Sequence, residues 1–194
     1  MSSVTRRSFE MKLAAKDLDR ARDSLDAKRA QRAIRAAMNQ TANSARTTAA
    51  REVAKGSGMK VRDAKRQMRV DKAAKDLPAA RVVATGRPVR LIQASRGARQ
   101  TKSGVSLNRG GGSRETLAHT FLATMPDSGR RGIFVRKGQR PLPIRELFGQ
   151  SVPAVMLRDS VNRAIRDHIA ETLPRALTRQ IDRQQRAAAG KNRR

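Results

Sequence analysis

The longest regular pattern of apolar positions lies in the N-terminal part of the chain, in a stretch with neither glycine nor proline. Residues 17–55 are rich in Ala, Arg, Leu, Gln and Lys, which favour helices, and apolar positions recur every three or four residues. The spacing gives two stripes: Leu18, Ala21 and Leu25, then Ala30, Ile34, Ala37, Met38, Thr41, Ala45, Ala49 and Val53. The register changes between Leu25 and Ala30, which predicts a kink or short turn at 26–29. Gly56-Ser57-Gly58 predicts the end of the helix, because glycine is favoured just past a helix.

A second helical pattern lies near the C-terminus, at residues 152–173. Its apolar positions gather toward one side: Val155, Leu157, Val161, Ala164, Ile165, His168 and Ile169. Pro174 predicts an interruption, because proline cannot donate the backbone hydrogen bond of a helix interior. Residues 176–189 predict a further helical piece with a basic outer face, and the tail from Gly190 is expected to be disordered.

Short apolar segments between these helices predict a small sheet. Candidate strands lie at 9–13, 68–72, 81–85 and 89–94, with a short helix at 59–67. Residues 117–125 and 132–137 form the best hairpin candidate, joined by Pro126-Asp127-Ser128-Gly129. Residues 144–148 predict about one helical turn that Gly149 ends.

Residues 95–114 differ from their surroundings, because they are dominated by Gly, Ser, Arg and Lys and contain Gly110-Gly111-Gly112. This composition predicts a long, exposed basic loop with at most a brief strand at 105–108. The expected fold class is therefore α+β, a small antiparallel sheet flanked by long N-terminal and C-terminal helices. We expect one domain at 1–173, which includes the loop, followed by a basic helical extension and tail at 174–194.

Composition adds a thin core and a strongly cationic surface to this picture. The 194 residues are 38% hydrophobic but only 2% aromatic, with no Trp or Tyr. Lys and Arg number 44 against 16 Asp and Glu, so the net charge is +28, and no acidic residue lies between Leu77 and Arg114. The repulsion among so many positive charges favours binding to an anionic partner, either nucleic acid or an acidic protein surface. The scarcity of aromatic residues argues against stacking on single-stranded bases, which leaves the duplex backbone.

Residues suited to catalysis are few. His119 and His168 are the only histidines, and the sequence has no HExxH, no GxSxG and no paired-carboxylate signature. Residues 97–103 end in Lys-Ser like a P-loop but lack the glycine before Lys102. There is no cysteine for a disulfide or thiolate site, and no apolar run of membrane-spanning length. We expect a non-enzymatic protein without cofactor or metal, made on the cytoplasmic side.

Large apolar and basic residues are concentrated between Thr120 and Met156. We expect Phe121 and Phe134 to pack in a core, because both lie on predicted strands. Phe148 stands among turn residues and is the better interface candidate. Proline fixes the backbone before binding, so the segment 141–153 is suited to rigid docking. The predicted protein interface comprises Leu142, Pro143, Ile144, Glu146, Leu147, Phe148, Val152 and Pro153.

Three sequence blocks resemble the minor tail protein Z family of long-tailed bacteriophages and prophages, also described as tail completion proteins. They are NQTANSARTTAAREVAK (39–55), GRPVRLI (86–92) and FLATM…RGIFVRKG…LPIRELFGQSVPAVM (121–156). In the third block, residues Leu142 to Pro153 match the family pattern Leu-Pro-Ile-x-Glu-Leu-x-Gly-x-Ser-Val-Pro in order and without gaps. The resemblance reaches from about residue 30 to residue 156, and the two ends of the chain carry no recognised motif.

This resemblance implies a structural virion protein at the head-proximal end of the tail, assembled in the host cytoplasm. Such a protein would complete the tail for head-tail joining and help to position the genome end. Similar neck and tail-terminator proteins are α+β and commonly form six-fold rings around the DNA path. The implied partners are further copies of the chain, tail terminator and tail tube proteins, head-completion or connector proteins, and duplex DNA.

Within such a ring, the basic region is expected to meet the DNA backbone. The candidate contact residues are Arg87, Arg90, Arg96, Arg99, Lys102, Arg109 and Arg114, with the C-terminal helix as another source of arginines. Acidic protein surfaces remain an alternative ligand for these cations. Two other functions stay open: a free, non-sequence-specific nucleic-acid-binding protein of nucleoid or ribosomal type, and a small hydrolase that depends on His119 or His168.

Overall fold

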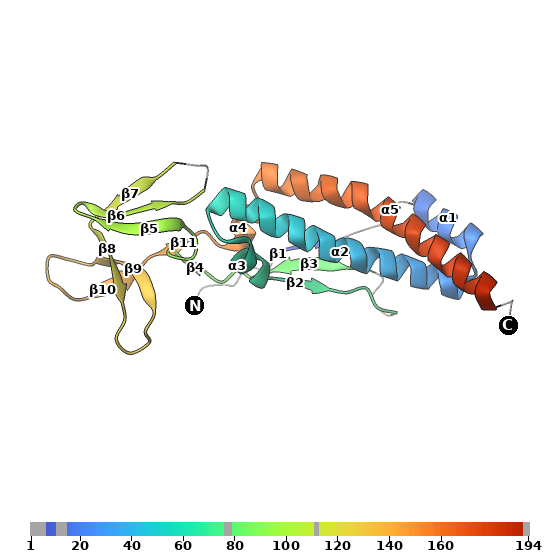
Figure 1. Ribbon diagram of the computed structural model, residues 1–194, viewed down its shortest axis with the longest axis horizontal. Helices are drawn as coiled ribbons and strands as arrows, with labels where there is room; N and C mark the ends of the chain where they lie inside the picture. The colour runs from blue at the N-terminus through green and yellow to red at the C-terminus, as the bar shows by residue number, and fades with distance from the viewer. Residues whose placement is uncertain (1–6, 11–14, 76–78, 111–112, 192–194) are drawn as a thin grey trace.

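The structure, a computed structural model, describes residues 7–10, 15–75, 79–110 and 113–191. The fold is α+β, as predicted, and elongated, with a helical part at one end and a β-rich part at the other (Figure 1). The helices are α1 (Ala15–Ser24), α2 (Ala27–Ser57), α3 (Val61–Arg66), α4 (Val152–Met156) and α5 (Asp159–Lys191).

The predicted break in the N-terminal helix is confirmed, because α1 and α2 are separate helices. Asp26 caps α2, and its carboxylate accepts a hydrogen bond from the Arg29 backbone N–H at 2.9 Å. This bond satisfies one of the donors that a helix start leaves free. At the other end, Gly58 has φ 74° and donates its N–H to the Ala54 carbonyl. The helix thus continues two residues beyond the predicted Lys55.

Antiparallel packing of α2 against α5 forms the scaffold of the helical part (Figure 1). The second predicted stripe lies in this scaffold: Ala30, Ala37, Met38, Thr41, Ala45, Ala49 and Val53 are all buried. Two polar contacts tie the helices together. Ser44 Oγ lies 2.7 Å from His168 Nε2, and Gln180 Nε2 donates to Gln40 Oε1 at 3.3 Å. His168 is therefore a structural residue between two helices.

A three-stranded antiparallel sheet lies beside α2, in the order β1-β3-β2. Its strands are β1 (Arg7–Glu10), β2 (Met68–Asp71) and β3 (Arg81–Ala84). The strands predicted at 68–72 and 81–85 are confirmed, and the one at 9–13 is confirmed for residues 9 and 10, since 11–13 lie outside the described residues. Val82 packs with Met38 and Ala42 of α2, so the sheet shares the core of the helices.

The β-rich part, here called the β body, comprises residues 86–149. Its strands are β4 (Val89–Arg90), β5 (Arg96–Thr101), β6 (Gly104–Asn108), β7 (Glu115–Ala118), β8 (Thr120–Thr124), β9 (Arg131–Arg136), β10 (Ile144–Glu146) and β11 (Phe148–Gly149). They form two three-stranded antiparallel sheets, β5-β6-β7 and β10-β9-β8, and a pair, β11-β4. Leu91, Val105, Leu107 and Ile133 form its core, separate from that of the helices. The predicted hairpin is confirmed as β8 and β9.

Three predictions for this region are wrong. Residues 95–114 are not a loop, because β5 and β6 form a hairpin within them and β6 also pairs with β7. The brief strand predicted at 105–108 is confirmed within β6. The candidate strand at 89–94 is confirmed only at Val89 and Arg90, and it does not extend the β1-β3-β2 sheet, since β4 pairs with β11. Residues 144–148 form strand rather than a helical turn, because β10 pairs with β9. In each case pairing with a partner strand overrides the local composition.

The predicted interruption at Pro174 and the disordered tail from Gly190 are also corrected, because α5 is continuous from Asp159 to Lys191. Proline in a helix interior costs about 3 kcal/mol through the lost hydrogen bond and steric clash. Leu173, Ala176 and Leu177 are buried against the other helices and offset this cost. Residues 192–194 lie outside the described part of the chain.

A glycine series tests the contact between α2 and the β body. A Cβ on Gly58 would lie 2.7 Å from the Arg109 carbonyl carbon, in addition to the strain of φ 74°. We expect Gly58→Ala to lower the free energy of unfolding by more than about 2 kcal/mol. Gly129→Ala, which has only the strained φ of 60°, should cost about 1 kcal/mol. Gly138→Ala, with open space around it, should be neutral, and equal losses for all three variants in urea unfolding would contradict this order.

The alanine contact between the helices is tested by enlarging one side chain. Ala49 is fully buried in the cluster that joins α2, α4 and α5. Ala49→Leu should lower the free energy of unfolding by about 1–3 kcal/mol, because the added carbons force the helices apart. Ala170→Leu on the exposed face of α5 is the matched control and should change it by less than about 0.5 kcal/mol. Thermal unfolding followed by circular dichroism compares the two.

Candidate functional site

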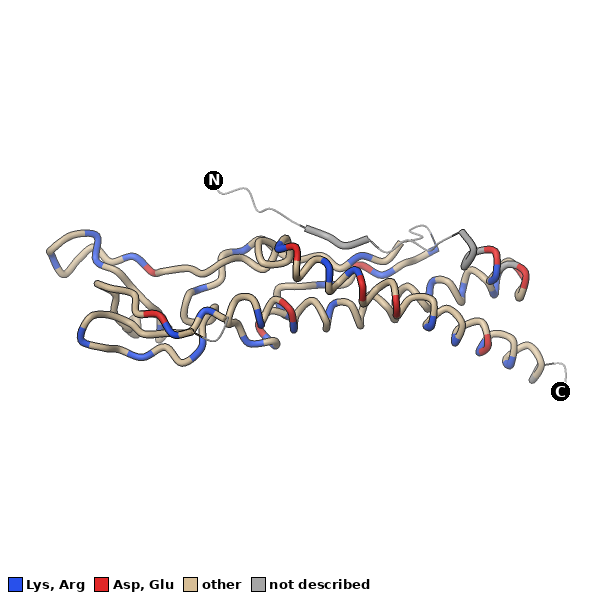
Figure 2. Tube along the Cα trace, turned by 90° about the horizontal axis from the view of Figure 1, so that it is seen from above, with Lys and Arg blue, Asp and Glu red and all other residues tan. Residues whose placement is uncertain are grey.

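The cationic residues are spread along the whole molecule, but the acidic ones are sparse in the β body (Figure 2). Residues 86–149 hold thirteen Lys and Arg against three acids, Glu115, Asp127 and Glu146. Glu115 pairs with Arg109, and Glu146 lies 4.0 Å from Arg90. Most cations of the β body therefore have no acidic partner among the residues that the structure describes, and this surface is the strongest candidate for contact with an anion.

The seven predicted DNA-contact residues all lie in the β body, but they fall into two groups. Arg90 and Arg109 are held in ion pairs, and Arg114 donates to the carbonyls of Gly97 and Ser106 at 2.7 and 3.2 Å. These three arginines stabilise the β body itself. The other four are exposed, and their side chains form no hydrogen bond or ion pair with the residues that the structure describes: Arg87, Arg96, Arg99 and Lys102.

The eight predicted interface residues also divide. Leu142 and Phe148 are exposed, at 68% and 54%, and Pro143 lies beside Leu142 on the surface. Ile144, Glu146 and Leu147 are half-buried, and Leu147 packs against the core of the β body. Val152 and Pro153 are buried in α4. Only the part of this segment that precedes α4 presents apolar side chains to a partner.

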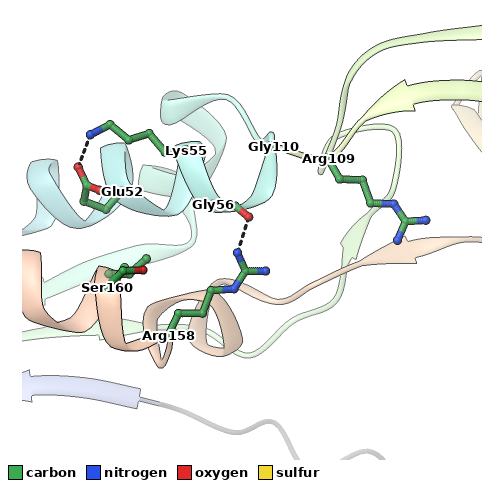
Figure 3. Close-up of a pocket in the computed structure, with 8 residues that line it drawn as sticks. Glu52, Lys55, Gly56, Arg109, Gly110, Arg158 and Ser160 are labelled. Carbon is green, nitrogen blue, oxygen red and sulfur yellow. Dashed lines mark hydrogen bonds and ion pairs between the residues drawn. The ribbon is translucent and has the colours of Figure 1, made fainter. Parts of the chain in front are cut away.

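A pocket of about 450 Å³ lies where α2, the β6–β7 connection and α5 meet. We call it the joint pocket (Figure 3). Its cations are already occupied: Lys55 pairs with Glu52 at 2.7 Å, and Arg158 donates to the Gly56 carbonyl at 2.6 Å and to Gln150. Arg109 points away from Glu52 and Lys55 toward the β body (Figure 3). The joint pocket is thus a structural contact between the two parts of the molecule.

A larger cleft, of about 670 Å³, lies in the β body and is here called the β cleft. Its lining residues are Gln100, Lys102, Ser103, Gly104, His119, Thr120, Phe121, Arg136, Lys137, Gly138 and Gln139. Of the predicted contact residues, only Lys102 lines it. Sequence reasoning missed the others because residues 95–114 were expected to form a loop, whereas β5 and β6 form a hairpin and β6 pairs with β7. The dense cations at 130–145 were the one available signal.

His119 and His168 lie in different parts of the molecule, so they do not share a site. His119 connects β7 and β8 with φ 58°, a backbone conformation that few side chains adopt. Within the described residues, no cluster of three or more His, Cys, Asp or Glu side chains is placed to bind a metal ion. No helix in that part of the chain is long and apolar enough to cross a membrane.

Comparison with known proteins gives one match. No curated protein and no solved structure matches the chain. The sequence model of the family described as prophage minor tail protein Z matches residues 13–191. This range extends well beyond the three blocks that suggested the resemblance, and includes α1 and α5, the first and last helices along the chain. The chain therefore belongs to the prophage minor tail protein Z family.

Proposed function

We propose that this protein is a structural component of a phage tail that acts at the head-proximal end, where it completes the tail for joining to the head. The observation that carries the proposal is the family match over residues 13–191. The thin core and the net charge of +28 support an assembled protein, since further copies of the chain supply burial and anionic virion partners supply counter-charge. We propose a hexameric ring around the DNA path as the assembled form.

Contact with the genome end is the proposed role of the β body. Arg87, Arg96, Arg99 and Lys102 are exposed and unpaired among the described residues, so they can meet phosphates without breaking an internal ion pair. Such contacts bind the DNA backbone without reading sequence. This suits a protein that must accept any genome end. Arg90, Arg109 and Arg114 would contribute through the shape of the β body.

Docking on neighbouring tail proteins is proposed for the segment that contains Leu142 and Phe148. Both are large apolar side chains with more than half of their surface in water. The segment is fixed at its ends, because Lys137 N–H donates to the Pro143 carbonyl at 3.0 Å and Leu147 N–H donates to that of Ile133 at 2.8 Å. A fixed segment loses little conformational entropy on binding. Tail terminator, tail tube and head-completion proteins are the proposed partners.

We further propose that the protein has no enzymatic activity and needs no cofactor. The two histidines support this, because the His168 ring contacts Ser44 between α2 and α5, and no carboxylate that could orient the His119 ring is among the residues that line the β cleft with it.

The proposed location is tested by imaging assembled particles. A small tag on the C-terminus, labelled with gold, should appear at the end of the tail next to the head in electron micrographs. Tails assembled without this protein should fail to join heads. Label found only at the distal tip would contradict the proposal, and absence from virions would favour the free nucleic-acid-binding protein.

The docking segment is tested by polar substitution. Leu142→Ser with Phe148→Ser should lower incorporation into tails, measured by immunoblot of purified particles, because the apolar contact is lost. Both side chains are exposed, so the free energy of unfolding should change by less than about 0.5 kcal/mol. Leu157→Ser, at a side chain that is 52% exposed beside α4, is the matched control. The proposal is wrong if the control and the double variant are incorporated equally.

A further inference from the structure

We propose that the β cleft is a binding site for phosphate groups of a duplex DNA backbone, built from Lys102, Arg136 and Lys137 with His119 at its rim. This inference rests on the proposed function only for the choice of DNA as ligand. The cleft volume of about 670 Å³ lies within the range of ligand sites in proteins, roughly 300–1,000 Å³. No acidic side chain is among its lining residues.

Three separate segments bring the cations together. Lys102 lies in the turn between β5 and β6, His119 between β7 and β8, and Arg136 and Lys137 at the end of β9. These segments meet because β6 pairs with β7 while β8 pairs with β9. The left-handed backbone at His119 lets the chain leave one sheet and enter the next. Cations from both sheets therefore face one space.

The walls of the β cleft are held by hydrogen bonds that do not involve the cationic groups. Gln100 donates its side-chain amide to the Gly104 carbonyl at 3.0 Å and accepts from Leu122 N–H at 2.9 Å, which joins the two sheets. The Thr120 hydroxyl accepts from Val105 N–H at 3.1 Å. The site is thus shaped before any ligand arrives, and a ligand need not order it.

The cationic side chains of the β cleft are available to bind a ligand. Within the described part of the chain, Lys102, Arg136 and Lys137 form no ion pair. Arg136 lies over the Phe121 ring, with 5.1 Å from Cζ to the ring centroid, which orients its guanidinium without neutralising it. The joint pocket shows the opposite arrangement, because its Lys55 and Arg158 are bound to groups of the chain. Three unpaired cations around a polar space match an anion with several oxygen acceptors.

The other lining groups also favour a DNA backbone over an acidic protein. Ser103, Gln139 and the histidine ring add short polar groups beside the cations, and phosphate contacts in protein–DNA complexes come from these residue types together with Arg and Lys. Arg96 and Arg99 on β5 are further exposed cations of the β5-β6-β7 sheet. Their position suits a charged polymer that extends beyond the cleft.

The two histidines permit a direct test on the full chain. His119 lines the β cleft, whereas His168 lies between α2 and α5 and serves as the internal reference. A short random-sequence DNA duplex at low salt should shift the ring signals of His119 in NMR spectra, with saturation, and leave those of His168 in place. The variant Lys102→Gln with Arg136→Gln and Lys137→Gln should lose about tenfold or more in affinity. The slope of log K against log salt should fall by about 1 for each substituted cation.

A second triple variant of equal charge change is the matched control. Arg179→Gln, Arg183→Gln and Arg186→Gln alter exposed arginines in the C-terminal part of α5, and the C-terminal end of this helix lies at the opposite end of the molecule from the β body (Figure 1). This variant should leave the His119 shift in place. Lys102→Gln alone, in an exposed turn, tests the site without risk to folding. Equal losses in both triple variants, DNA binding with His119 unmoved, or an equal shift caused by polyglutamate would overturn the proposal. Absence of DNA binding would also overturn it, while particle imaging tests the tail location independently.

Discussion

The close contact between α2 and α5 is the constraint on which the rest of the structure depends. The side chains that α2 presents to it are mostly alanines, such as Ala42, Ala45 and Ala49, which are fully buried. Each alanine buries little area, and burial stabilises by about 25 cal/mol per Å². Small side chains allow close approach, but the contact must be long to be stable. The length of both helices follows from this, and the β1-β3-β2 sheet and α4 pack on the same scaffold.

The two parts of the molecule differ in how many of their cationic side chains are left without an acidic or hydrogen-bonding partner. At the joint between them, Lys55, Arg109 and Arg158 are bound by Glu52, Glu115 and backbone or amide oxygens. Further into the β body, the acids are too few to pair with the cations. Self-repulsion of unpaired cations is unfavourable in the isolated chain, so an anion at this surface lowers the free energy of the assembled state. The lean core and the cationic β body therefore both favour a protein that works in an assembly.

Local sequence predicted secondary structure poorly where a segment forms a strand only because it pairs with another strand. The sequence of β5, RGARQT, contains one β-branched residue and lies mostly in water, so composition alone favours a loop. It is a strand because β6, buried at four of its five positions, supplies a fixed edge to pair with. Pro174 is the helical counterpart. Burial of Leu173, Ala176 and Leu177 outweighs the penalty of a proline inside α5, and those contacts come from residues far away in the chain.

The sequence by itself determined the α2 stripe, the break at Asp26, the β8–β9 hairpin, the family and the cationic character. Each of these depends on the identity and spacing of residues that are neighbours in the sequence. Helix caps, turns and helical periodicity can therefore be predicted from the sequence directly. Only the tertiary structure decided which residues of 142–153 are exposed and which arginines form ion pairs or hydrogen bonds within the chain. It also decided that Lys102 and Arg136 line the same cleft. Burial and pairing join segments distant in the chain, and the free energy that selects among such pairings is a property of the packed whole rather than of any one segment.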